Sequence, residues 1–300
     1  IFFILSAVVI IAGFVTMGVH KGNGGDALNY SLEFKGGTST SVEFNEDMSI
    51  EELDEKVVPI IEEISKDANV QTQKVQGSNQ VIFKSATLDV SQREELNSRL
   101  EEEFGVDPEK ITAETISSTI SSEMRTGAVS AVVVSTVLML LYVWFRFKDV
   151  RFGASSVAAL VHDVLVVLAF YAAARVSVGN TFIACMLTIV GYSINATIVI
   201  FDRIRENMTS YKTKEELAAI VNRSISQTLS RSIFTSLTTF IMVAVLYILG
   251  VSSIKEFALP LMVGIACGTY SSICLASAFW YLLRTRVGGK KAEKNKKAAK

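Results

Sequence analysis

Three ionisable residues lie inside or beside long apolar runs and are the first candidates for chemistry in this chain. His162 and Asp163 lie about ten residues into the apolar stretch 154–174, and Arg231 directly precedes the stretch 232–250. A charged side chain near the middle of a bilayer costs roughly 2.5–3.5 kcal/mol or more, so such residues usually have a function. A carboxylate at that depth can be neutralised by a proton, which makes Asp163 a candidate carrier of a proton or another cation, and His162 could share that proton.

Each of these residues also has a purely structural explanation. Asp163 would then be hydrogen-bonded to a neighbouring helix, and His162 would fill an interior position. Arg231 opens the fifth apolar stretch, where it either extends its side chain to the interface or lies within the bilayer and needs an acidic partner. The residue types alone leave these alternatives open.

A polar run in the fourth apolar stretch is the next candidate. Gly191 would allow a close approach of helices, and Ser193, Asn195 and Thr197 can hydrogen-bond across that approach, with Tyr192 beside them. The run continues into a mixed set of charged and polar residues, namely Asp202, Arg203, Arg205, Glu206 and Asn207. At a helix end this set can form local ion pairs, dock a loop of a neighbour, or simply be a solvated cap.

Six apolar stretches must position these side chains. They cover residues 1–19, 127–145, 154–174, 181–201, 232–250 and 257–283. About 20 apolar residues suffice for a helix to cross ~30 Å of hydrocarbon. We therefore expect a polytopic α-helical membrane protein with six transmembrane helices, the first of them an uncleaved anchor.

The composition agrees with a membrane protein and excludes other classes. Of the 300 residues, 50% are hydrophobic and 20% charged, which is too apolar for an ordinary soluble domain. The net charge of −1 conceals a strongly acidic block, because residues 20–126 hold 10 Lys and Arg against 22 Asp and Glu. No folded polar region carries a basic patch, so we expect no nucleic-acid partner.

The distribution of Lys and Arg predicts the orientation in the membrane. Three lie in 146–151, five in 202–230 and eight from residue 284 onwards, whereas the connections on the other side hold only Arg175 and Lys255. Basic loops stay on the cytoplasmic side. We expect cytoplasmic termini, a transmembrane helix at 1–19, an extracytoplasmic domain at 20–126, five more spans in 127–283, and a basic cytoplasmic tail at 284–300. We expect this tail to be disordered and to face membrane lipids or the ribosome, or else only to set the topology.

The acidic block reads as a small α+β domain. Residues 28–34 and 39–44 alternate in polarity around Lys35–Thr38, which predicts a hairpin, and 70–75 and 81–83 predict a second hairpin. Ser49 and Glu52 form a capping box before a helix whose apolar face is Leu53, Val57, Ile60, Ile61 and Ile64. A second helix at 91–104 and a strand at 111–116 complete the order ββαββαβ, which suggests a ferredoxin-like sandwich.

Neither part of the chain shows the residues of an enzyme. The acidic block contains no nucleophile–base pair, and the spacing of Cys185, Cys267 and Cys274 matches no metal site. We expect no catalytic residue, no resident metal and no cofactor.

The run Val190-Gly191-Tyr192-Ser193-Ile194-Asn195-Ala196-Thr197-Ile198-Val199-Ile200-Phe201-Asp202-Arg203-Ile204-Arg205-Glu206-Asn207 resembles the signature of the SecF family. SecF belongs to the RND transporter superfamily. Three further segments resemble the family in the same chain order: Phe34-Lys35-Gly36-Gly37-Thr38, Val161-His162-Asp163-Val164, and 227–239. Gly36, Gly37 and Thr38 would be a weak signal alone, but the longer run is specific.

The resemblance implies a partner of SecD that associates with the SecYEG channel and assists late translocation of exported preproteins across the bacterial cytoplasmic membrane. It implies coupling to the proton or sodium motive force, and it places Arg231 on an arginine that the family uses for this coupling and Asp163 on its His-Asp acid. One position departs from the family, because Ala196 stands where an acid often follows the asparagine. The carboxylate would then come from Asp163 or from SecD, and Asn195 could orient it but not replace it.

Two other functions remain compatible with the same residues. An RND-type half-transporter for a lipid or small molecule would have a similar order of elements. A passive assembly factor of the translocon would need no ion coupling, and Ala196 keeps this alternative open.

Overall fold

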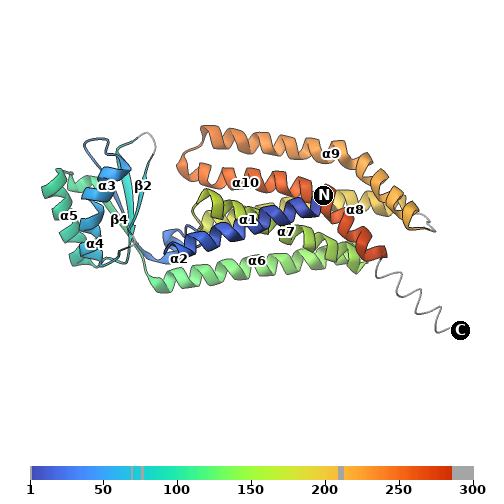
Figure 1. Ribbon diagram of the computed structural model, residues 1–300, viewed down its shortest axis with the longest axis horizontal. Helices are drawn as coiled ribbons and strands as arrows, with labels where there is room; N and C mark the ends of the chain where they lie inside the picture. Colours follow the sequence, from blue (N-terminus) through green and yellow to red (C-terminus); the bar gives the residue numbers. More distant parts are fainter. Residues whose placement is uncertain (1, 69, 76–77, 209–212, 286–300) are drawn as a thin grey trace. The chain divides into compact units, whose positions relative to one another are not determined.

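The computed structural model describes residues 2–68, 70–75, 78–208 and 213–285. The chain divides into two compact units (Figure 1). The α+β unit is Tyr30–Val129, and the helical unit combines Ile1–Asn29 with Ser130–Lys300. Most of the basic tail expected at 284–300 lies outside the described residues.

The α+β unit is built on a four-stranded antiparallel sheet. Its strands are β1 (Gly37–Glu43), β2 (Gln71–Lys74), β3 (Gln80–Ser85) and β4 (Ile111–Ile116), and their order in the sheet is β2-β3-β1-β4. Between β1 and β2 lie α3 (Ile50–Lys56) and α4 (Val58–Ser65), and between β3 and β4 lies α5 (Val90–Phe104). The βαββαβ order is that of the split βαβ motif, which confirms the expected ferredoxin-like type.

The helices of this unit are capped and packed as their sequence predicts. Ser49 Oγ accepts the backbone N–H of Glu52, and the Glu52 carboxylate accepts the N–H of Ser49, so the expected capping box is present. Asp89 and Gln92 form a second capping box before α5, which the sequence analysis missed. The apolar faces of these helices pack on the sheet and form one hydrophobic core with it. Buried residues of this core include Val42, Leu53, Ile61, Phe83, Leu96 and Leu100.

The first predicted hairpin is wrong. Residues 28–34 form no strand; instead α2 (Leu32–Lys35) makes a single helical turn, closed by the Gly36 N–H donating to the Leu32 carbonyl over 2.8 Å. Gly36 and Gly37 follow with φ of 75° and 123°, and the chain enters β1. Both edges of β1 are already paired, with β3 and with β4, so a preceding antiparallel strand has no place beside it. Thr38, near the start of β1, is buried, and its hydroxyl oxygen accepts a hydrogen bond from the Leu88 backbone N–H.

Six long helices among the described residues are apolar enough to cross a membrane. They are α1 (Phe2–Gly22), α6 (Ser118–Phe147), α7 (Val150–Ala174), α8 (Asn180–Asn207), α9 (Lys214–Leu249), and α10 (Ser252–Tyr270) with its continuation to Thr285. The expected six spans are thus confirmed by length and composition. The helices extend beyond the apolar stretches, and Arg231 lies well inside α9 instead of opening it. The polar first turns of α9, which Thr213 caps, run into the apolar part of the same helix without a break.

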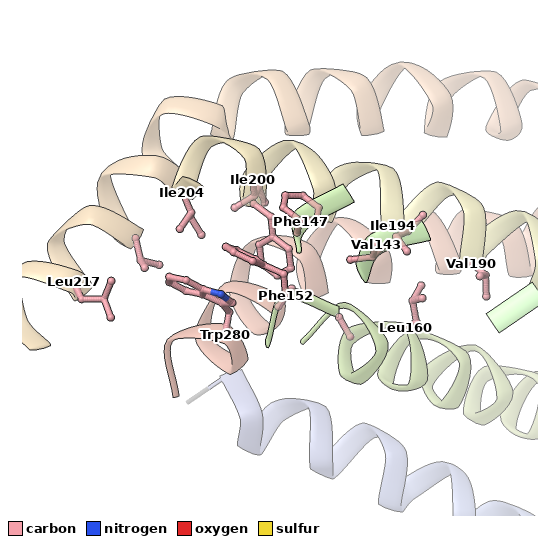
Figure 2. Packing of buried hydrophobic residues seen from close by; sticks show 14 residues of the cluster. Val143, Phe147, Phe152, Leu160, Val190, Ile194, Ile200, Ile204, Leu217 and Trp280 are labelled. Carbon is pink, nitrogen blue, oxygen red and sulfur yellow. The ribbon is translucent and has the colours of Figure 1, made fainter. Parts of the chain in front are cut away.

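Three helices form the centre of the helical unit. Of the apolar windows, 44% of α7, 44% of α8 and 56% of α10 are buried, against 6% of α6. At one end of this centre Phe152 stacks on Trp280 with ring centroids 4.8 Å apart, and Phe201 meets Phe152 edge-on at 4.9 Å. Figure 2 shows Phe152 and Trp280 among the aliphatic side chains of this cluster. Aromatic and aliphatic side chains therefore pack closely at this end of the centre.

Candidate functional site

Asp163 is enclosed at the meeting point of these three helices. It lies near the middle of α7 and is only 1% exposed. Its Oδ2 accepts the hydroxyls of Ser193 on α8, at 2.6 Å, and of Ser271, at 2.8 Å. Its Oδ1 lies 2.9 Å from His162 Nδ1 and 3.3 Å from the Cys267 thiol on α10. Four polar groups from four segments therefore surround one carboxyl group.

We call the polar side chains around Asp163 the Asp163 cluster. A π-helical segment that follows α10, Ser271–Ala276, adds Ser271 and Ser272 to this cluster. Ser272 hydrogen-bonds the Thr197 hydroxyl at 2.9 Å and donates to the backbone carbonyl of Ser193 at 3.2 Å. Single π turns inside α-helices occur frequently at functional sites. The sequence analysis anticipated Ser193 and Thr197 as polar contacts but missed Cys267, Ser271 and Ser272. The visible signal was a Ser-Ser pair four residues after a cysteine in an apolar helix.

Close helix packing holds the cluster, but at other glycines than the predicted one. A Cβ atom added to Gly268 of α10 would lie 3.1 Å from the Ser193 Cβ, and one at Gly264 would overlap the Ile189 side chain. A Cβ at Gly191 would have no neighbour within 4 Å in the described chain. Gly191 thus makes no close approach within the described chain, and its part in helix packing stays a prediction. The α8–α10 contact depends on two small residues four apart on α10, which share one helix face.

The cluster can hold a proton or a cation. His162 Nδ1, an Asp163 carboxylate oxygen and Cys267 Sγ all lie within 4.8 Å of one another, and these are atoms that bind metal ions. Within the described residues no Lys or Arg pairs with Asp163. The ionised carboxylate accepts up to four hydrogen bonds here, whereas a protonated one must donate one of them. A change of charge at Asp163 therefore alters contacts to α8 and α10.

The cluster lies beside an apolar cavity. His162 and Cys267 line this cavity of about 450 Å³ together with Leu5, Val9, Phe240 and Tyr270. The His162 and Tyr270 rings are 6.0 Å apart. One side of the buried cluster thus faces open space instead of a packed helix.

Arg231 does not join Asp163. It lines a second cavity of about 80 Å³ with Tyr192, Asn195 and Ala196. Those three residues lie on a different face of α8 from Ser193, which contacts Asp163. Within the described residues Arg231 forms no ion pair, so this chain alone does not assemble an Asp163–Arg231 pair.

The charged end of α8 docks onto two neighbouring helices. The Asp202 carboxylate forms an ion pair with the Arg146 guanidinium of α6 at 2.8 Å. Arg203 donates to Gln227 of α9 and to Glu206, at 2.6 and 2.7 Å. Asn207 donates to Ser224 and Gln227 of α9 over 2.9 and 2.8 Å, whereas the Arg205 side chain is exposed. Most of this set therefore ties helices together instead of serving only as a solvated cap.

Comparison with known proteins assigns the fold to a family. Residues 96–286 match the family described as protein export membrane protein SecD/SecF, C-terminal. The protein translocase subunit SecF of Sebaldella termitidis is 38% identical over 271 residues, covering 90% of this chain and 86% of that protein. The chain belongs to the SecF family. The SecF of Acidaminococcus fermentans is 32% identical and covers 96% of each chain.

Solved structures show the same SecF fold within a longer protein. The crystal structure of SecDF from Thermus thermophilus superimposes with a TM-score of 0.78 at 36% identity over 95% of this chain. A crystal structure of SecDF in a super-membrane-facing form gives a TM-score of 0.64 at 36% identity. The present chain spans 38% of the first SecDF chain and 39% of the second.

Proposed function

We propose that this SecF-family chain is an accessory subunit of the Sec protein translocase. It would act with a SecD partner at the SecYEG channel and promote the late export of preproteins across the bacterial cytoplasmic membrane. The family membership supports the translocase role, because relatives of nearly the same length are named protein translocase subunit SecF. The fused SecDF relatives support SecD as the partner.

The enclosed Asp163 is the observation that carries the energetic part of the proposal. One elementary charge that crosses 100 mV is worth about 2.3 kcal/mol. In the proposed cycle a proton or sodium ion that enters the membrane neutralises the Asp163 carboxylate. The neutralised Asp163 then accepts the hydrogen bonds of the Ser193 and Ser271 hydroxyls less strongly than the carboxylate does. This change favours a different packing of α7 against α8 and α10.

The α+β unit is the proposed moving part. The asymmetry of Lys and Arg supports its placement on the extracytoplasmic side, where it would meet the emerging preprotein.

The test is preprotein release into inverted membrane vesicles that contain SecD with either the parent chain or Asp163→Asn. ATP is supplied only for the early stage, and a proton or sodium gradient is then imposed. Asp163→Asn should reduce gradient-driven release by about tenfold or more, since the site would lose its share of about 2.3 kcal/mol per charge and 100 mV.

Asp149→Asn is the matched control. Asp149 caps the same helix, α7, and pairs with Arg284, outside the Asp163 cluster. This variant should respond to the gradient as the parent does. An equal response of parent and Asp163→Asn would place the ion-binding acid in SecD, and loss of SecD co-purification in Asp163→Asn would show a structural role for Asp163.

A passive assembly role is the second candidate, and Ala196 favours it. The chain places no acid in the cavity of Arg231, so the arginine has no switchable partner within the described residues. This alternative predicts that neither a proton gradient nor a sodium gradient speeds release in the parent.

A further inference from the structure

His162, Asp163 and Cys267 bring three metal-binding atoms together inside the Asp163 cluster. Asp163 Oδ1 lies 2.9 Å from His162 Nδ1 and 3.3 Å from Cys267 Sγ, and the nitrogen and sulfur atoms are 3.9 Å apart. A nitrogen, an oxygen and a sulfur atom from three side chains therefore surround one point. Cys267 lies 104 positions beyond Asp163 in the chain, so no spacing in the sequence predicts this set.

The triangle of these three atoms has the size that a tetrahedral metal site requires. Zinc binds nitrogen and carboxylate oxygen at about 2.0–2.2 Å and thiolate sulfur at about 2.3 Å, which places tetrahedral ligand atoms roughly 3.3–3.6 Å from one another. The separations of 2.9, 3.3 and 3.9 Å each lie within about 0.5 Å of this range. Small rotations of the three side chains therefore suffice to seat an ion between them.

The remaining contacts of Asp163 orient its carboxylate for such an ion. The second oxygen, Oδ2, accepts the hydroxyls of Ser193 and Ser271, and Oδ1 is left for His162 and Cys267. Hydrogen bonds to a ligating carboxylate form the outer shell of a metal site and fix the direction of its ligands. His162 and Cys267 also line the cavity of about 450 Å³, which leaves room for a water molecule as a fourth ligand.

Charge and ligand chemistry select a divalent transition metal for this position. On binding, the Cys267 thiol loses its proton to solvent, and the imidazole of His162 binds through Nδ1 and keeps its proton on Nε2. The thiolate and the Asp163 carboxylate then carry two negative charges, which a divalent ion neutralises. Neutrality matters inside a membrane, where an uncompensated charge is costly. Thiolate and imidazole ligands favour zinc, whereas Mg²⁺ and Ca²⁺ prefer oxygen ligands.

We propose that His162, Asp163 and Cys267 form a binding site for one divalent transition metal ion of the zinc class. The ion joins α7 to α10 at the Asp163 cluster and takes a water molecule from the side of the cavity. This site goes beyond the proposed ion coupling and does not rest on it, because metal binding requires neither a gradient nor SecD.

The test is a titration of Co²⁺ into the purified full chain in nanodiscs of zwitterionic lipid. Co²⁺ takes the place of Zn²⁺, and its absorption spectrum reports the ligands. A tetrahedral site with a thiolate gives intense d–d bands and a sulfur-to-cobalt charge-transfer band. Both should saturate at one Co²⁺ per chain, and Zn²⁺ should displace Co²⁺ and abolish them. X-ray absorption by the zinc-loaded parent should show one sulfur atom bound to the metal.

Two serine variants separate this site from other thiols of the chain. Cys267→Ser should lose the charge-transfer band and bind Zn²⁺ about a hundredfold more weakly or worse, since even the hydrogen-bond partners of metal ligands are worth roughly 10–100-fold in affinity. Cys274→Ser is the matched control, because it removes a free cysteine outside the Asp163 cluster, and it should keep the spectrum of the parent. If Cys267→Ser does not fold, the X-ray absorption of the parent still tests the sulfur ligand.

Three results would overturn the proposal. The absence of a charge-transfer band in the parent at saturating Co²⁺ would leave His162, Asp163 and Cys267 as a hydrogen-bonded cluster only. An unchanged spectrum in Cys267→Ser, or a spectrum lost in Cys274→Ser, would place the sulfur ligand elsewhere. The proposed coupling fails by a different result, namely preprotein release that does not respond to a gradient.

Discussion

Asp163 and Arg231 show two ways in which a helical unit handles a charge. Asp163 is surrounded by polar groups of its own chain, from His162 to Ser271, and its charge can be accommodated without a counter-ion. Arg231 is exposed, and the side chains that line its cavity within the described residues are uncharged. The first arrangement favours a site whose charge can change, whereas the second leaves a fixed charge exposed on the described chain.

Outside the membrane, two carboxylates of the α+β unit make its stability depend on pH. The backbone N–H of Gln92 and then the Ser91 hydroxyl lower the pKa of Asp89, and the backbone N–H of Ser49 and then the charge of Lys56 lower the pKa of Glu52. A carboxylate whose pKa is lower in the folded state stabilises the fold above its unfolded pKa, and this contribution is lost as the pH falls through the folded pKa.

We therefore expect the unfolding midpoint of the full chain to fall as the pH is lowered below about 4, the range in which unfolded Asp and Glu titrate. Asp89→Asn keeps a capping side chain but does not titrate, so its loss of stability between pH 6 and pH 3 should be smaller than that of the parent. Circular dichroism during heating measures both. An identical pH dependence in the two proteins would contradict the contribution of Asp89.

At the scale of helices, contact between elements depends on glycines that the local pattern does not single out. Gly13 of α1 lies so close to α7 that an added Cβ would overlap the Ala169 Cβ and lie 2.6 Å from its Cα. Gly264 of α10 lies equally close to the Ile189 side chain of α8, which is 1% exposed. These two contacts fix the spacing of α1, α7, α8 and α10 around Asp163.

Gly13→Ala and Gly264→Ala should each destabilise the chain by about 1–3 kcal/mol, because buried backbone or a buried isoleucine must shift. Gly191→Ala is the matched control, since its Cβ would meet nothing within 4 Å of the described chain and alanine favours the helix by about 1 kcal/mol. Thermal unfolding in nanodiscs provides the comparison. Equal tolerance of all three alanines would contradict the close approaches.

For the whole molecule, the distribution of Lys and Arg predicts an orientation across the membrane, and labelling can test this prediction. A cysteine at the exposed Ser98 of α5 should react with a membrane-impermeant maleimide in intact cells, because the α+β unit is expected outside the cytoplasm. A cysteine at the exposed Glu215, at the start of α9, should react only after permeabilisation. The parent chain gives the background from its own three cysteines. Reversed accessibility would contradict the proposed orientation.

The sequence by itself determined the elements that depend on local chemistry. Hydropathy sets the six apolar helices, the capping box at Ser49 sets the start of α3, and the apolar spacing from Leu53 to Ile64 sets the face that packs on the sheet. It also indicated Asp163, since a carboxylate inside an apolar run stands out without any knowledge of its neighbours.

Only the tertiary structure decided which residues meet. The carboxyl of Asp163 contacts Ser193 and Ser271, which lie 30 and 108 positions away in the chain. The periodicity of a single helix relates only residues three or four positions apart, so it cannot predict these contacts. The same holds for Arg231, whose cavity is closed by another helix, and for residues 28–34, whose alternation suits a strand but whose place beside β1 is already taken by β3 and β4. Local patterns fix an element and its faces, whereas the competition of distant segments for the same neighbour fixes the site.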